Sequence, residues 1–199
     1  MEMEKETQQK RAISQDEILL VALKLFGNQG YFNTSLTDIK DELGLKTTSG
    51  IYQHFKTKQA IAEKLYENIL DSLSISVDDI RRRNSNASEQ LREIVDLFFT
   101  LTDDAPEVMR FLLLTKLEEF LPEKKPLFYS TPFYKIRRIF QNGIKQGEIR
   151  AIDPAIAYSH FFGIVNHALQ MVLTGALNKK AGSYQSQVWL AAWNCVAKR

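Results

Sequence analysis

Residues 34–58, TSLTDIKDELGLKTTSGIYQHFKTK, determine how the whole chain is interpreted. Thr34 and Ser35 are good N-caps, because a side-chain oxygen can accept a hydrogen bond from a free amide of the first helical turn. Apolar residues at helical spacing follow them and end at Gly44. Glycine enters the left-handed conformation at little steric cost, so Gly44 predicts a turn after a short helix.

A second group of capping residues, Thr47 to Ser49, follows the glycine, and Ile51 and Phe55 then place apolar side chains on one face. Two such helices form either an ordinary αα-hairpin or a helix-turn-helix, whose second helix enters the DNA major groove. Small hydroxyl side chains at the start of the second helix favour the helix-turn-helix, because they permit close approach to a duplex and bind phosphate oxygens.

The flanking sequence predicts further helices on both sides of this pair. Ser14 and Glu17 form a capping box before an apolar stretch, which predicts a first helix that ends near Gly27–Gly30. From Thr57, apolar residues repeat every four positions to about Arg83 and predict one long helix. The first three helices therefore form a small head, and the long helix connects this head to the rest of the chain.

The second half of the chain is predicted to be helical throughout. The predicted helices run from about residue 88 to 102, from 104 to 120, from 131 to 147, from 153 to 177 and from 183 to 198. Ser88 and Ser183 are the expected caps of the first and last of these helices. The fold class is therefore all-α, with about nine helices.

Composition limits the possible classes of protein. The net charge is only +2, and residues 1–58 contain as many acidic as basic residues, so DNA binding depends on local placement of charge. The single cysteine, Cys195, excludes an internal disulfide and fits a reducing cytoplasm. The apolar runs are too short to cross a bilayer, and the charged N-terminus has no signal-peptide segment. We therefore expect a cytoplasmic protein with no membrane partner and a flexible arm at about residues 1–13.

Enzymatic chemistry has no support in the sequence. There is no glycine-rich phosphate motif, no His-Glu-x-x-His and no nucleophile paired with a base. His160 and His167 are seven residues apart, with no carboxylate or cysteine at ligand spacing, which argues against a metal site. We expect neither an enzyme nor a cofactor. A protein-interaction adaptor that uses the same fold is the alternative from another class.

The segments ILLVALKLFGNQGYFNTSLTDIKDELGL and SGIYQHFKTKQAI resemble the N-terminal domain of the TetR family of bacterial transcription regulators, over residues 14–65. This resemblance implies a helix-turn-helix DNA-binding domain at residues 1–56 and a helical effector-binding and dimerisation domain at residues 57–199. One departure is that Lys46-Thr47-Thr48 makes the turn one residue longer than is usual in the family. Which of these three residues faces the bases is left open.

The resemblance also implies a set of DNA contacts. One of Thr34 and Ser35 should bind a phosphate, and residues 47–50 should lie against base edges and backbone. Tyr52, His54 and Lys58 should hold phosphates, although His54 can alternatively cap a helix. Gln53 can either read an adenine with two hydrogen bonds or be solvated. The implied contact residues are Thr34, Ser35, Lys46, Thr47, Thr48, Ser49, Gly50, Tyr52, Gln53, His54 and Lys58.

The last two long helices are apolar over much of their circumference, as in the dimer interface of the resembled family, although burial within a monomer would give the same pattern. The predicted interface residues are His160, Phe161, Ile164, Ala168, Val188, Trp189 and Trp193. The predicted ligand-binding residues are Phe98, Met109, Phe111, Phe128, Phe133, Tyr134, Asn166 and His167. Aromatic residues at this spacing also fit an ordinary core, and the last two polar residues also fit the interface.

Together these features predict a DNA-binding transcriptional regulator. The expected form is a homodimeric repressor on double-stranded DNA at a palindromic operator, released by a small and largely apolar effector. Release requires the effector to bind the two states with different affinity. Activation, or a requirement for a corepressor, is the alternative regulatory outcome.

Overall fold

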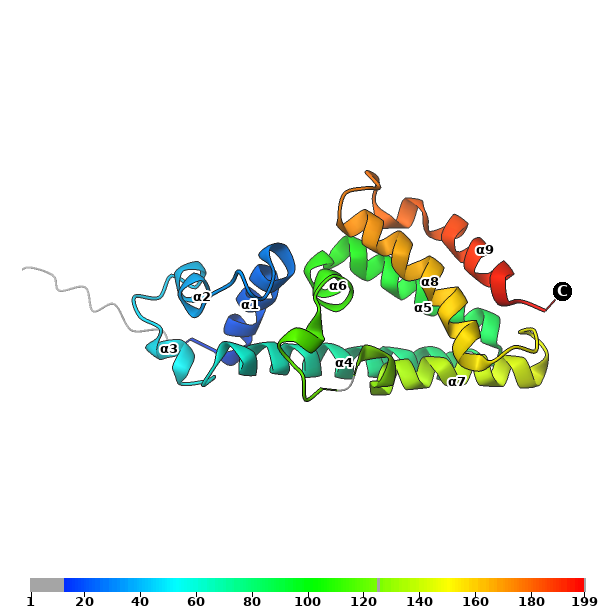
Figure 1. Cartoon of the computed structure of the whole chain (residues 1–199), viewed down its shortest axis with the longest axis horizontal. Helices are drawn as coiled ribbons and strands as arrows, with labels where there is room; N and C mark the ends of the chain where they lie inside the picture. The colour runs from blue at the N-terminus through cyan, green and yellow to red at the C-terminus, as the bar shows by residue number, and fades with distance from the viewer. Residues whose placement is uncertain (1–12, 125, 199) are drawn as a thin grey trace, which may run out of the picture.

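The structure, a computed structural model, describes residues 13–124 and 126–198, and these residues form nine α-helices (Figure 1). Within them the only β-type pairing is an isolated bridge between Ile149 and Ala197. The prediction of an all-α fold is confirmed. The helices are α1 Gln15–Gln29, α2 Leu36–Glu42, α3 Ser49–Tyr52, α4 Lys58–Arg83, α5 Ala87–Asp104, α6 Pro106–Leu113, α7 Thr131–Gln146, α8 Pro154–Leu173 and α9 Gln185–Val196, with short 3-10 turns η1 Leu117–Glu119, η2 Leu127–Tyr129 and η3 Ala181–Ser183. No helix in the described ranges is both long enough and apolar enough to cross a membrane.

Helices α1 to α3 form the head at one end of the molecule, and their ends follow from local capping. The Ser14 hydroxyl accepts a hydrogen bond from the Glu17 amide at 3.2 Å, and the Glu17 carboxylate accepts one from the Ser14 amide at 2.9 Å. Ser35 and Asp38 form the same reciprocal box before α2. Gly44 follows α2 with φ +68°, the left-handed conformation that the turn requires.

Helix α4 is the axis of the molecule, and α7 lies beside it along its second half (Figure 1). Thr57 caps α4, since its hydroxyl accepts a hydrogen bond from the Ala60 amide at 3.0 Å. Lys135 of α7 donates to the Ser74 hydroxyl at 2.6 Å and also pairs with Asp78, both on α4. The long helix therefore has the predicted start and end, and it is fixed to the rest of the chain along its length.

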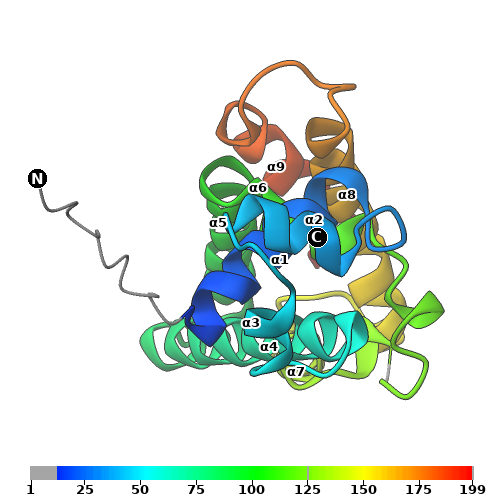
Figure 2. The same ribbon diagram turned by 90° about the vertical axis from the view of Figure 1, so that its left-hand side faces the viewer.

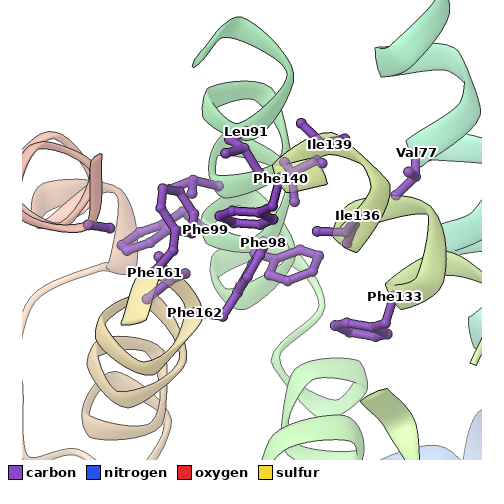
Figure 3. Packing of buried hydrophobic residues seen from close by; sticks show 14 of the residues in the cluster. Val77, Leu91, Phe98, Phe99, Phe133, Ile136, Ile139, Phe140, Phe161 and Phe162 are labelled. Carbon is purple, nitrogen blue, oxygen red and sulfur yellow. The ribbon is translucent and has the colours of Figure 1, made fainter. Parts of the chain in front are cut away.

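The larger core is aromatic and lies among α5, α7 and α8 (Figure 3). Phe140 is fully buried, and its ring centroid lies 5.6 Å from that of Phe161 and 6.3 Å from that of Phe162. Phe98 contacts Phe162 from α5, with ring centroids 6.0 Å apart. Such edge-to-face contacts are an arrangement that aromatic rings prefer, and they join α5, α7 and α8 into one packed body.

The head does not have a core of its own. Its buried cluster also contains Phe111, Leu117 and Phe120, which come from the segment around α6. Helix α6 approaches α1 closely, because a Cβ at Gly27 would lie only 2.9 Å from the Glu107 carbonyl oxygen. Glycine at this position therefore permits the two helices to touch along their backbones.

Four predicted helix boundaries are wrong, and the first is the end of α8, which lies at Leu173 and not at about residue 177. Asn86 caps α5 in place of Ser88, because its side-chain oxygen accepts a hydrogen bond from the Glu89 amide at 2.8 Å. Helix α6 ends at Leu113 instead of residue 120, since η1 turns the chain back toward the head. Ser183 lies in η3, so α9 begins two residues later than predicted.

Candidate nucleic-acid interface and effector cavity

The free end of the head carries the residues predicted to contact DNA, and Figure 2 views the molecule from this end. Tyr52 has 53% of its surface exposed although it follows the fully buried Ile51. A large aromatic side chain with a hydroxyl is therefore held on the surface by the packing of its neighbour. The predicted contact residues that are exposed are Ser35, Lys46, Thr47, Ser49, Tyr52, Gln53 and His54.

The additional residue of the turn lies before α3, which begins at Ser49. Thr48 occupies the N-cap position in the αR conformation, and its hydroxyl makes no capping hydrogen bond. Lys46 and Thr47 are exposed, whereas Thr48 is half-buried. Gly50 faces inward, because a Cβ there would lie 3.4 Å from a methyl group of Ile13. The exposed part of this turn is therefore Lys46 and Thr47, with the Thr48 hydroxyl free of helix capping.

Thr34 does not fit the role of a phosphate contact, because only 1% of its surface is exposed. Its hydroxyl donates to the Gly30 carbonyl at 2.9 Å and accepts from the Gln29 side chain at 3.2 Å. Of the two alternatives at the start of α2, only Ser35 is exposed. The Ser35 amide and hydroxyl hold the pKa of the Asp38 carboxyl below its usual value.

The structure places Lys58 within the head as well. Its ammonium donates to the Tyr31 carbonyl at 2.8 Å and to the Thr34 carbonyl at 2.7 Å, and it lies 4.1 Å from the Tyr31 ring centroid. Burial lowers the pKa of this ammonium, and the charge of Asp38 opposes the shift. The Tyr31 ring in turn stacks on Phe120 at 3.8 Å. Lys58 thus connects the start of α4 to the α1–α2 turn, and its phosphate role stays a prediction.

His54 is exposed, and its Nε2 lies 2.8 Å from the Ile13 carbonyl oxygen. This hydrogen bond joins the end of α3 to the chain just before α1. The arm predicted at residues 1–13 lies almost wholly outside the described residues, which begin at Ile13.

A cavity of about 540 Å³ opens beside α8 in the body. This volume falls within the range usual for small-molecule sites. Asn166 contributes a buried side-chain oxygen that has no hydrogen-bond partner among the described residues. The lining residues are Phe128, Ala155, Tyr158, Ser159, Phe162, Gly163, Asn166, His167 and Gln170.

Three of the predicted ligand residues, Phe128, Asn166 and His167, line this cavity. The others do not. Phe111 is fully buried in the head cluster, and Tyr134 is half exposed on α7. The remaining three, Phe98, Met109 and Phe133, are buried in the body core.

The sequence-based prediction missed most of the α8 wall of the cavity. Small residues at Ala155, Ser159 and Gly163 follow one another at intervals of four, which places them on one helical face. Small side chains on a single face leave open space, and this spacing could have identified the wall. Tyr158 and Phe162 were also missed, because aromatic residues in a helix have the same pattern when they only fill a core.

The predicted interface residues divide into two groups. Phe161 is fully buried between Phe140 and Trp189 of the same chain, so it belongs to the body core and not to an exposed face. His160 is exposed, and the rest are half-buried along α8 and α9. Trp189 and Trp193 stack with centroids 5.6 Å apart. Ile156 and Leu190 add exposed apolar surface at 49% and 58%.

Comparison with known proteins supports the interpretation of the head. Residues 18–65 match the sequence profile of the bacterial regulatory proteins of the tetR family. A transcriptional regulator with a helix-turn-helix, YfiR of Bacillus subtilis (strain 168), is 26% identical over 178 residues, which are 83% of this chain and 84% of that protein. The repressor KstR2 of Mycolicibacterium smegmatis is 34% identical over 71 residues, which are 36% of this chain and 34% of that protein.

The similarity to solved structures extends over both parts of the fold. The regulator FadR from Bacillus subtilis, solved in complex with stearoyl-CoA, superposes with a TM-score of 0.70 at 16% identity, over 92% of this chain and 99% of that one. The exposed α2–α3 surface of the head, the helical body and the similarity to these regulators all indicate the same class of protein. Residues 18–65 carry the tetR-family domain, and together these findings support a DNA-binding transcriptional regulator of the TetR family.

Proposed function

We propose that the protein is a homodimeric, cytoplasmic repressor that leaves a palindromic operator when a small effector binds the α8 cavity. In this proposal residues 1–56 recognise DNA, and residues 57–199 bind the effector and form the dimer. The protein acts as a regulator and not as an enzyme. The observation that carries the proposal is the direct connection from the cavity, through α6, to the head.

The exposed surface of α2 and α3 supports the DNA contacts. Lys46 supplies a positive charge beside Thr47, and Tyr52 supplies a hydroxyl from the far end of α3. Hydroxyl and amide groups of this kind contact phosphates and base edges. We therefore assign the base and phosphate contacts of this surface to Lys46, Thr47, Thr48, Ser49, Tyr52 and Gln53. Ser35 is the phosphate contact at the start of α2.

The connection between cavity and head begins at Gln170. This side chain lines the cavity and donates a hydrogen bond to the Leu113 carbonyl, at the last residue of α6, with a length of 3.0 Å. Arg110 of the same helix donates to the Asn28 side chain of α1 at 3.0 Å. Because α6 also touches α1 at Gly27, a displacement of α6 must move α1 or break this contact.

The face formed by α8 and α9 supports the dimer. Its half-buried tryptophans and exposed Ile156 and Leu190 make an apolar surface on the outside of one chain. A second copy of the chain would bury this surface and present two heads, which suits half-sites about one helical turn apart or more. The relatives support ligand control, since FadR was solved with stearoyl-CoA and KstR2 is a repressor.

Selection of bound fragments from the source genome tests the proposal. We expect one enriched palindrome, bound by a species whose mass in multi-angle light scattering is that of two chains. Binding to this site should weaken linearly in a plot of log affinity against log salt concentration. Recovery of random fragments, or of a monomer on the enriched site, would contradict the proposal.

Substitution of Lys46 and Thr48 should separate phosphate contacts from base recognition. Lys46→Ala removes one positive charge from each of the two heads, so it should lower the slope of log affinity against log salt by about two and weaken all sequences similarly. Thr48→Ala should keep that slope and alter the preferred base by about 1–3 kcal/mol at one position of each half-site. Salt titrations with the selected operator and its single-base variants measure both effects. The assignment fails if the two variants behave alike.

Gln170→Ala should loosen the end of α6 without unfolding the protein. The Leu113 carbonyl loses one hydrogen bond, which is worth about 1 kcal/mol, so amide exchange in residues 113–115 should accelerate about fivefold. Hydrogen-exchange mass spectrometry measures this change. Ser159→Ala, on the same wall of the cavity, is the matched control and should leave these amides unchanged. Equal exchange in both variants would remove Gln170 from the proposed connection.

A further inference from the structure

Arg137 of α7 occupies an unusual position for a charged side chain. Its guanidinium lies 4.1 Å from the ring centroid of Phe128 and 5.7 Å from those of Tyr129 and Tyr134. Its Nε is buried and has no hydrogen-bond partner. In contrast, Lys135 on the same helix is paired with Asp78. Among the described residues, no ion pair includes Arg137.

Arg137 does not itself line the cavity, but its guanidinium contacts a residue that does. Phe128, on which it stacks, lines the cavity and meets Tyr158 edge-on, with ring centroids 5.2 Å apart. Tyr158 lines the cavity too. Burial raises the pKa of the Tyr158 hydroxyl, and the positive charge of Arg137 acts in the opposite direction. Arg137 is therefore close enough for its field to reach groups at the cavity surface.

This arrangement favours an anionic ligand. The Nε–H donor of Arg137 is unused among the described residues, and a guanidinium can donate two parallel hydrogen bonds to one carboxylate. The cavity lining, as far as the structure describes it, contains no acidic side chain that would repel an anion. Ser159, Asn166 and Gln170 are uncharged polar members of this lining. Phe128 and Phe162 offer apolar surface to the rest of such a ligand.

We propose that the effector is an organic carboxylate with an apolar body, whose carboxylate pairs with Arg137 and whose body lies against Phe128 and Phe162. This inference rests on the proposed role of the α8 cavity as the effector site. The carboxylate gives Arg137 the partner that it lacks within the chain.

The test uses the full-length protein and paired probes in isothermal titration calorimetry. The probes are straight-chain carboxylates of six to twelve carbons, phenylacetate and their hydroxylated derivatives, each with its primary amide. We expect at least one acid to bind about tenfold more tightly than its amide, since a charge-assisted hydrogen bond is lost in the amide. Arg137→Gln should remove this preference, and Arg137→Lys should restore it in part. Arg138→Gln, at an exposed position on the same helix, is the matched control and should bind as the unmodified chain does.

The inference is overturned if no acid binds, if acid and amide bind equally, or if Arg137→Gln retains the preference while circular dichroism shows a folded protein. Operator binding is measured separately for the same samples. If an acid binds through Arg137 but operator affinity does not change, the ligand class stands and the proposed release mechanism fails. If the operator is not bound at all, the proposed regulatory function fails independently of the ligand.

Discussion

Alanine in place of Phe111 should lower the free energy of unfolding by about 3–5 kcal/mol, because the substitution removes a large buried ring and leaves a cavity. Phe111 is fully buried, and its ring centroid lies 6.4 Å from that of Phe26 and 6.5 Å from that of Phe120. It is the ring by which α6 enters the core of the head. Loss of this ring should therefore also weaken operator binding, since the head would no longer be held at one angle to the body.

Urea denaturation at a fixed protein concentration measures the first effect, with amide exchange in α1 as a local probe. Phe32→Ala is the matched control, because Phe32 is an aromatic residue of the same region with 63% of its surface exposed. This control should change stability by less than about 1 kcal/mol. If both variants unfold at the same urea concentration, α6 does not contribute to the head core in the way described.

Alanine in place of Phe140 should also lower the free energy of unfolding by about 3–5 kcal/mol, but here the body should be the part that is destabilised. Phe140 is fully buried at the centre of the aromatic cluster, with the Tyr158 ring centroid at 6.0 Å and that of Phe161 at 5.6 Å (Figure 3). Because Phe161 also contacts Trp189, tryptophan fluorescence should report the loss directly. The substitution should also weaken ligand binding, since Tyr158 forms part of the cavity wall.

Ile75→Ala is the control for Phe140→Ala, because 71% of the Ile75 surface is exposed. It should shift stability by no more than about 0.5 kcal/mol. The fluorescence and circular-dichroism transitions of Phe140→Ala should move together if the body unfolds as one unit. A loss below about 1 kcal/mol would mean that the cluster tolerates the cavity, and the central role assigned to Phe140 would be wrong.

The sequence by itself determined where most helices begin and end. The capping pairs at Ser14 and Ser35, the cap at Thr57 and the Asp153-Pro154 start are all where the sequence places them. These features depend on hydrogen bonds between residues three or four positions apart, so a local sequence contains the necessary information. The family resemblance also depended on such local order, and it identified the head and its function.

Tertiary structure decided which side chains are free to act. Thr34 and Lys58 both have suitable chemistry for phosphate binding. Thr34, however, is buried in the α1–α2 turn, and the Lys58 ammonium donates hydrogen bonds to two carbonyls of that turn. Phe111 and Phe128 look alike in sequence, yet Phe111 fills the head core and Phe128 lines the α8 cavity. Burial depends on contacts between residues far apart in the chain, such as Lys58 with Tyr31 and Gln170 with Leu113. Helical periodicity shows which residues share a face, but it does not show what that face meets.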